Sequence, residues 1–143
     1  MQYGRTLAGA LEPGSVIGLV GDLGSGKTCF IKGLASVLAG IPENEVTSPT
    51  FTFMQEFPGQ VPLYNFDLYR AAGSADLYDL GFEECLYGGG VTVIEWADRA
   101  EGALPAECII LRMEFIAEQE RRLMFTAHGA RHAELLINFK NKS

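Results

Sequence analysis

Gly21-Asp22-Leu23-Gly24-Ser25-Gly26-Lys27-Thr28 has the spacing G-x-x-x-x-G-K-[ST], which is typical of a loop that cradles nucleotide phosphates. Before it comes the short apolar run 15–20, introduced by Pro13-Gly14, and after it residues 29–38 carry apolar side chains at helical spacing. Strand, loop and helix therefore follow one another in the order that this loop requires. The alternative is a glycine-rich turn that only caps an ordinary helix.

The residue types in this stretch suit phosphate binding. Gly21 and Gly26 permit close backbone approach, so that successive N–H groups can point at phosphate oxygens at a helix N-terminus. Lys27 would reach the β- and γ-phosphates, and the Thr28 hydroxyl would ligate magnesium. Cys29 follows at the helix start, where a thiolate is stabilised, although a small buried residue is the simpler interpretation. The candidate nucleotide-binding residues here are Asp22, Leu23, Gly24, Ser25, Gly26, Lys27, Thr28 and Cys29.

Length and composition predict one globular domain over residues 1–143, with 48% hydrophobic and 20% charged residues. No apolar run approaches the roughly 18 to 20 residues that span a bilayer. Residues 1–11 lack the charged start and long apolar centre of a signal peptide, so we expect no export. Three cysteines without metal-ligand spacing favour a reducing cytoplasm.

The net charge of -7 bears on nucleic-acid partners. Proteins that grip nucleic acid alone usually carry a basic face, because phosphate contacts supply much of the affinity. This chain has eleven Lys and Arg residues and no basic cluster beyond Arg121-Arg122. Any role with RNA is therefore expected to run mainly through a partner protein.

The remaining pattern predicts an α/β fold, a P-loop NTPase-like three-layer sandwich with a mixed, partly parallel sheet and an antiparallel hairpin region. Alternation around Leu63, Asn65 and Asp67 fits an antiparallel strand with one face in water. The apolar run 91–96 fits a strand covered on both faces. Further expected elements are strand pairs over 50–57 with 61–69 and 108–116 with 121–128, the end of a short helix over 5–11, and helices over 74–80 and 131–140.

Two acidic residues follow apolar strand segments and are candidates for the metal and the attacking water. Glu95 closes the run 91–94, and Asp67 closes 63–66. In parallel α/β sheets the carboxyl ends of strands face the ligand crevice, so acids there are well placed for catalysis. The alternative for each is an ordinary strand end at the surface.

Other polar residues near these segments have two interpretations each. Thr50, with Ser48 and Thr52, either senses the γ-phosphate in a switch segment or begins a strand. Arg70 and Arg99 either neutralise transferred phosphoryl charge or form structural ion pairs. Trp96 either packs near the base or ribose or belongs to the core. His128 and His132 belong to no recognisable constellation and are assigned no chemistry.

Taken together, the motifs resemble the TsaE (YjeE) family, the ATPase component of bacterial tRNA threonylcarbamoyladenosine synthesis. The resemblance covers roughly residues 4–115 and is weak beyond Phe115. Members of the family usually have a longer segment before the position of Arg5, so this chain begins short. The matching segments are residues 21–28, Thr47-Ser48-Pro49-Thr50-Phe51-Thr52, Asn65-Phe66-Asp67-Leu68-Tyr69-Arg70, Leu80-Gly81-Phe82-Glu83-Glu84 and Ile94-Glu95-Trp96.

This resemblance implies a cytoplasmic, partner-stimulated ATPase that uses ATP and magnesium and works with TsaB and TsaD proteins. It implies metal or catalytic roles for Thr28, Asp67 and Glu95, with Lys27 on phosphate. Thr50 would lie in the switch segment, and Trp96 beside the nucleotide.

Two other function classes stay open from the residues alone. A small-molecule kinase uses the same loop, but it needs an acceptor pocket and usually a lid, for which 143 residues leave little room. A nucleotide-dependent binding module would use the loop without significant turnover. A GTPase is disfavoured, because neither N-K-x-D nor D-x-x-G occurs in the sequence.

Overall fold

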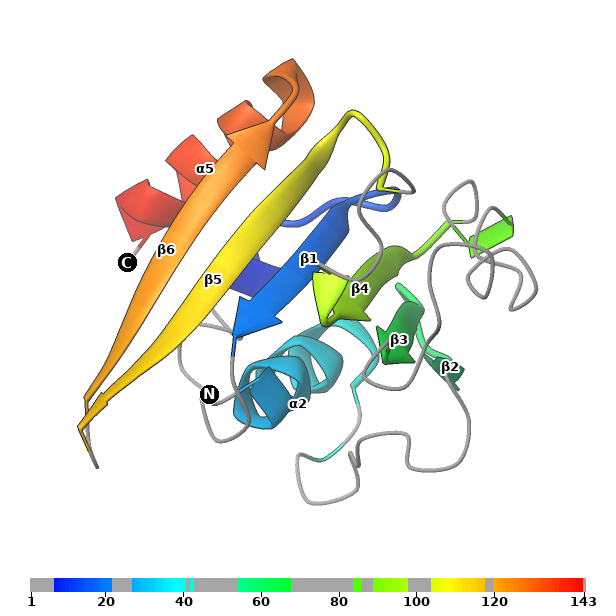
Figure 1. Cartoon of the computed structure of the whole chain (residues 1–143). Helices are drawn as coiled ribbons and strands as arrows, with labels where there is room; N and C mark the ends of the chain where they lie inside the picture. Colours follow the sequence, from blue (N-terminus) through cyan, green and yellow to red (C-terminus); the bar gives the residue numbers. More distant parts are fainter. Residues whose placement is uncertain are drawn as a thin grey trace.

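A computed structural model of the chain (Figure 1) describes residues 7–21, 27–40, 42, 54–67, 84–85, 89–97, 104–117 and 120–142. In this part of the chain, six strands form one sheet in the order β2-β3-β4-β1-β5-β6. The elements are β1 (Val16–Gly21), α2 (Lys27–Leu38), β2 (Met54–Phe57), β3 (Leu63–Asp67), β4 (Val91–Glu95), β5 (Cys108–Ala117), β6 (Glu120–His128) and α5 (Ala130–Lys142).

The four inner strands β3, β4, β1 and β5 run parallel to one another, whereas the edge strands β2 and β6 pair antiparallel with β3 and β5. The prediction of an α/β fold with a mixed, partly parallel sheet is thus confirmed. Both predicted strand pairs are present as β2 with β3 and β5 with β6, and the closing helix is α5. The helix expected over 74–80 lies outside the described residues.

One expectation about β3 is wrong. The strand is antiparallel to β2 but parallel to β4, and neither of its faces is left in water. Leu63, Asn65 and Phe66 are all buried, so both faces are covered. The reason is that packing covers both faces of the sheet here: Leu63 belongs to the cluster that contains residues of α2 and α5, and Phe66 belongs to the cluster on the opposite face.

The helices and the sheet share a hydrophobic core. One buried cluster contains residues of both helices, such as Leu34 of α2 and Phe139 of α5, together with Leu19 and Val93 of the inner strands. A second cluster contains strand residues that point to the opposite face of the sheet, such as Val20, Phe66 and Ile94. β4 is buried along its whole length, as the apolar run 91–96 predicts.

Local sequence explains where α2 begins and ends. Phe30, Ile31, Leu34 and Leu38 recur at helical spacing and are all buried, so they form the face that packs on the sheet. The helix stops before Gly40, whose φ of +70° is a left-handed conformation that glycine adopts without a side-chain penalty. The predicted stop at Gly40-Ile41-Pro42 is confirmed at Gly40.

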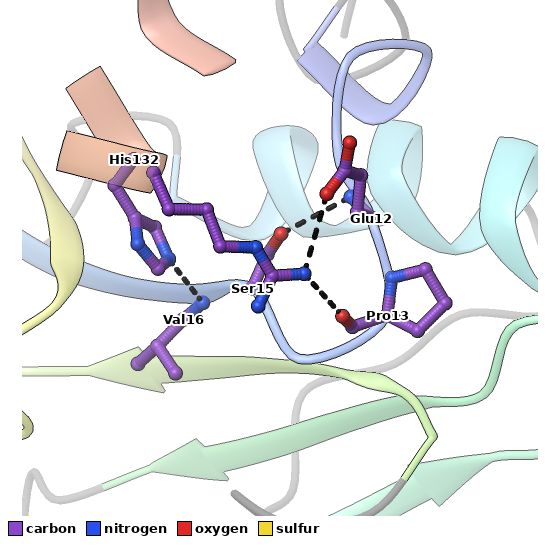
Figure 2. A network of polar contacts seen from close by, with 6 residues as sticks. Glu12, Pro13, Ser15, Val16 and His132 are labelled. Carbon is purple, nitrogen blue, oxygen red and sulfur yellow. Dashed lines mark hydrogen bonds and ion pairs between the residues drawn. The ribbon is translucent and has the colours of Figure 1, made fainter. Parts of the chain in front are cut away.

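The turn that leads into β1 is tied to α5 by polar contacts (Figure 2). Arg131 donates hydrogen bonds from Nη2 to the Pro13 carbonyl oxygen at 2.6 Å and to Glu12 Oε2 at 3.3 Å. The Val16 N–H donates to His132 Nε2 at 3.2 Å inside the protein. Because Nε2 accepts this bond, the ring is neutral and carries its proton on Nδ1.

This geometry predicts acid-sensitive stability. Burial lowers the pKa of His132, an effect that Arg131 reinforces and Glu107 opposes. Below about pH 6.5, the usual pKa of histidine, the unfolded chain therefore takes up the proton more readily than the folded one. The stability contributed by His132 is complete above that pH and is lost as the pH falls toward the lowered pKa.

Urea unfolding of His132→Gln at several pH values tests this expectation. The glutamine amide oxygen can accept the Val16 N–H bond without titrating, so stability should fall less between about pH 7 and 5 than in the wild type. The matched control is His128→Gln, because His128 is exposed. A wild-type pH slope in His132→Gln would contradict the assignment.

Candidate functional site

The phosphate-loop motif begins with the last residue of β1 and ends with the first residues of α2. β1 ends at Gly21, α2 begins at Lys27, and the five residues between them, which lie outside the described part, connect the two. Lys27 and Thr28 form the first positions of α2. Free N–H groups at a helix start attract anions, so this end of the sheet suits a phosphate.

The strand register places the two predicted acids, Asp67 and Glu95, side by side at the carboxyl ends of β3 and β4. Asp67 and Glu95 are direct partners in the parallel pairing of β3 with β4. On the other side of β4, Glu95 pairs with Leu19, two residues before Gly21. Glu95 therefore lies between Asp67 and the strand that enters the loop.

The Glu95 side chain is buried, with 4% of its surface exposed. Asn65 donates a hydrogen bond from Nδ2 to Glu95 Oε2 at 3.2 Å, and both groups are inside the protein. An ordinary strand end at the surface is therefore the wrong interpretation for Glu95. A buried carboxylate is costly without partners, which makes it a candidate for chemistry.

Trp96 follows Glu95 directly and has an unusual backbone. Its φ is +59°, a left-handed conformation that costs a bulky residue about 1–3 kcal/mol and is common at functional sites. Trp96 is half-buried and packs against the second hydrophobic cluster. It thus contributes to the core, and its contact with a nucleotide stays a prediction.

Only some of the other candidate residues lie in the part of the chain that the structure describes. Cys29 is exposed, so the interpretation as a small buried residue is wrong, because the start of α2 does not face the core there. His132 is buried as a structural residue and His128 is exposed. The candidates outside the described residues are Asp22, Leu23, Gly24, Ser25, Gly26, Ser48, Thr50, Thr52, Arg70 and Arg99.

Sequence reasoning missed one polar residue of this region, Asn65. The pattern placed it on the wet face of β3, yet none of its surface is exposed and it binds Glu95. The available signal was its position two residues before Asp67, which puts both residues on the same face of the strand.

A buried parallel strand that leads through the G-x-x-x-x-G-K-T motif into a helix, beside an acid at the end of the next strand, defines an α/β protein of the phosphate-loop class. Comparison with protein families adds detail. Residues 1–123 match the family described as "Threonylcarbamoyl adenosine biosynthesis protein TsaE". The chain belongs to the TsaE family.

Individual relatives agree with this assignment. A Treponema pallidum protein named "tRNA threonylcarbamoyladenosine biosynthesis protein TsaE" is 44% identical over 122 residues, covering 85% of this chain and 89% of the relative. A Bacillus subtilis protein of the same name is 43% identical over 132 residues, covering 92% and 81%. The crystal structure of Bacillus subtilis YdiB superposes with a TM-score of 0.80 at 36% identity, covering 98% of this chain and 86% of that one.

Across the part of the chain that the structure describes, no helix is both long and apolar enough to span a membrane.

Proposed function

We propose that this chain binds ATP and hydrolyses it slowly in support of tRNA threonylcarbamoyladenosine modification next to the anticodon. It would act as a single P-loop ATPase domain over residues 1–143 in the cytoplasm, together with TsaB and TsaD homologues. The names of its relatives support the pathway. The observation that carries the ATPase proposal is the buried, hydrogen-bonded Glu95, which lies at the end of the sheet where β1 leads into the phosphate loop.

Several features at this end of the sheet suit the binding of a nucleotide with its magnesium ion. The backbone N–H groups at the start of α2 would bind phosphate oxygens, and Lys27 would add a positive charge. The Thr28 hydroxyl and the carboxylates of Asp67 and Glu95 are the oxygen ligands that magnesium prefers. When bound, the ion would neutralise charge that develops on the phosphoryl oxygens.

The two acidic residues, Asp67 and Glu95, would have different roles in hydrolysis. Glu95, held inside the protein, would orient a water molecule or a metal-bound water, and its neighbour in register, Asp67, would help to hold the metal. Thr50 would report the γ-phosphate to a partner, and Trp96 would lie beside the nucleotide. With a net charge of -7, contact with tRNA would run mainly through the partner proteins.

Removal of the Lys27 charge tests nucleotide binding at this edge. In Lys27→Ala we expect ATP affinity to fall by about 10- to 150-fold, because one charge-assisted contact contributes ~1.5 to 3 kcal/mol. Titration calorimetry with magnesium and ATP, repeated with GTP, measures the loss and the expected preference for ATP.

The matched control is Lys32→Ala, which removes a lysine from the same helix five residues after Lys27. We expect this variant to bind ATP as the wild type does. Equal ATP affinity in Lys27→Ala and the wild type would remove Lys27 from the site.

A further inference from the structure

An amide side chain occupies a core position in the middle of β3. Asn65 has none of its surface exposed. It pairs with Val93 on β4, and its neighbour two residues earlier, Leu63, belongs to the hydrophobic cluster beneath the helices. Buried polar side chains normally persist for a specific hydrogen bond, so the partner of Asn65 indicates its purpose.

That partner is the candidate acid. Asn65 Nδ2 donates to Glu95 Oε2 at 3.2 Å, reaching from its own register position toward the next residue of β4 on the same face. A carboxylate accepts hydrogen bonds and cannot donate them, so the amide must turn its NH₂ group toward Glu95. The chemistry of the pair therefore determines the orientation of the amide.

The bond constrains how Glu95 can act. Oε2 is directed toward β3, so the hydrogen bond fixes the χ3 angle of the Glu95 carboxylate. Without such a bond, glutamate χ3 angles are broadly distributed. This constraint prepares a group that must hold a metal ion or a water molecule in one place.

We propose that Asn65 is a positioning residue that holds the Glu95 carboxylate in one orientation for ATP hydrolysis. This inference rests on the proposed function, in which Glu95 acts on the metal or the water. Asn65 itself need not touch the nucleotide. Its loss should therefore lower kcat much more than it weakens ATP binding.

The principal variant is Asn65→Leu, which keeps the approximate shape and removes the donor. We expect kcat to fall by about 10- to 100-fold, as for other residues that orient a metal ligand, with ATP affinity changed by less than about threefold. The matched control is Gln55→Leu. Gln55 is the cross-strand partner of Asn65 on β2 and also carries an amide, so this variant should keep wild-type turnover.

A double-mutant cycle separates positioning from general stability. In a Glu95→Gln background, Asn65→Leu should lower kcat by less than about twofold further, because the group that it positions is already disabled. A merely structural role would lower kcat by the same factor in both backgrounds. Equal factors would therefore overturn the proposal.

A second variant, in which positions 65 and 95 exchange their amide and carboxylate groups, tests the proposal even if Asn65→Leu fails to fold. Asn65→Asp combined with Glu95→Gln keeps one amide, one carboxylate and the net charge, so the hydrogen bond can re-form in the opposite direction. We expect this variant to fold and bind ATP with turnover as low as that of Glu95→Gln. Near wild-type turnover in the swapped variant would overturn the proposal.

The outcomes also separate this inference from the function on which it rests. If Glu95→Gln hydrolyses ATP at the wild-type rate, the catalytic role of Glu95 fails, and the positioning role fails with it. If Glu95→Gln is slow but Asn65→Leu is not, only the role of Asn65 is wrong.

Discussion

Replacement of Glu95 by glutamine will lower ATP turnover by about 10²- to 10⁴-fold, the range that a positioned acid or base contributes to catalysis. Appreciable ATP affinity will remain, because Glu95 acts on the metal or the water and not on the base. Glutamine fits the buried site and its amide oxygen can still accept the Asn65 bond. The loss will therefore report charge and chemistry and not a collapsed site.

Single-turnover hydrolysis and calorimetry measure the two quantities on the same samples. Asp67→Asn, the neighbour in register, is expected to behave in the same way. Glu56→Gln is the matched control, since Glu56 is an exposed glutamate on the edge strand β2. Unchanged single-turnover hydrolysis in Glu95→Gln and Asp67→Asn would return both acids to a structural role.

Hydrolysis by the isolated chain will be slow and will rise when a complex of TsaB and TsaD homologues is added. If the partner supplies an arginine to the γ-phosphate, the expected stimulation is ~10³- to 10⁵-fold. If Arg70 or Arg99 already serves there, the stimulation will be smaller and will come from ordering residues 47–52. The partner must bind the two nucleotide states unequally, because equal affinity shifts no equilibrium.

Steady-state ATPase assays with increasing amounts of the partner complex measure this effect, and binding assays compare the ATP and ADP states. We expect tighter association with ATP and a loss of stimulation in Thr50→Ala. A high rate for the chain alone, unaffected by partners, argues for the kinase alternative. Phosphate transfer from ATP to an added small-molecule acceptor would then be the observation to seek.

The sequence predicts the parts of this fold whose signals are local. The alternation of strand and helix around residues 21–28 and the fully buried run at β4 require only short-range patterns. Sheet order and register depend on contacts between distant segments. For that reason the sequence could nominate Asp67 and Glu95 but could not pair them.

The errors have the same physical origin. Polar residues at alternate positions predict a solvent-exposed strand face, but Asn65 is buried and donates a hydrogen bond to Glu95, thirty positions away in the sequence. The left-handed backbone of Trp96 likewise has no local signature, because neither glycine nor asparagine stands there. Such exceptions to local rules are concentrated at functional sites, which agrees with the site proposed around Glu95.

The most direct test of the central claim counts modified tRNA. TsaB and TsaD homologues are supplied with tRNA, their other substrates, ATP and magnesium, with and without this chain, and threonylcarbamoyladenosine is counted per complex. We predict repeated turnover with the wild-type chain and little stimulation with Lys27→Ala or Glu95→Gln. Equal yields with the wild type, with either variant and without the chain would contradict the claim that its ATP hydrolysis supports the modification.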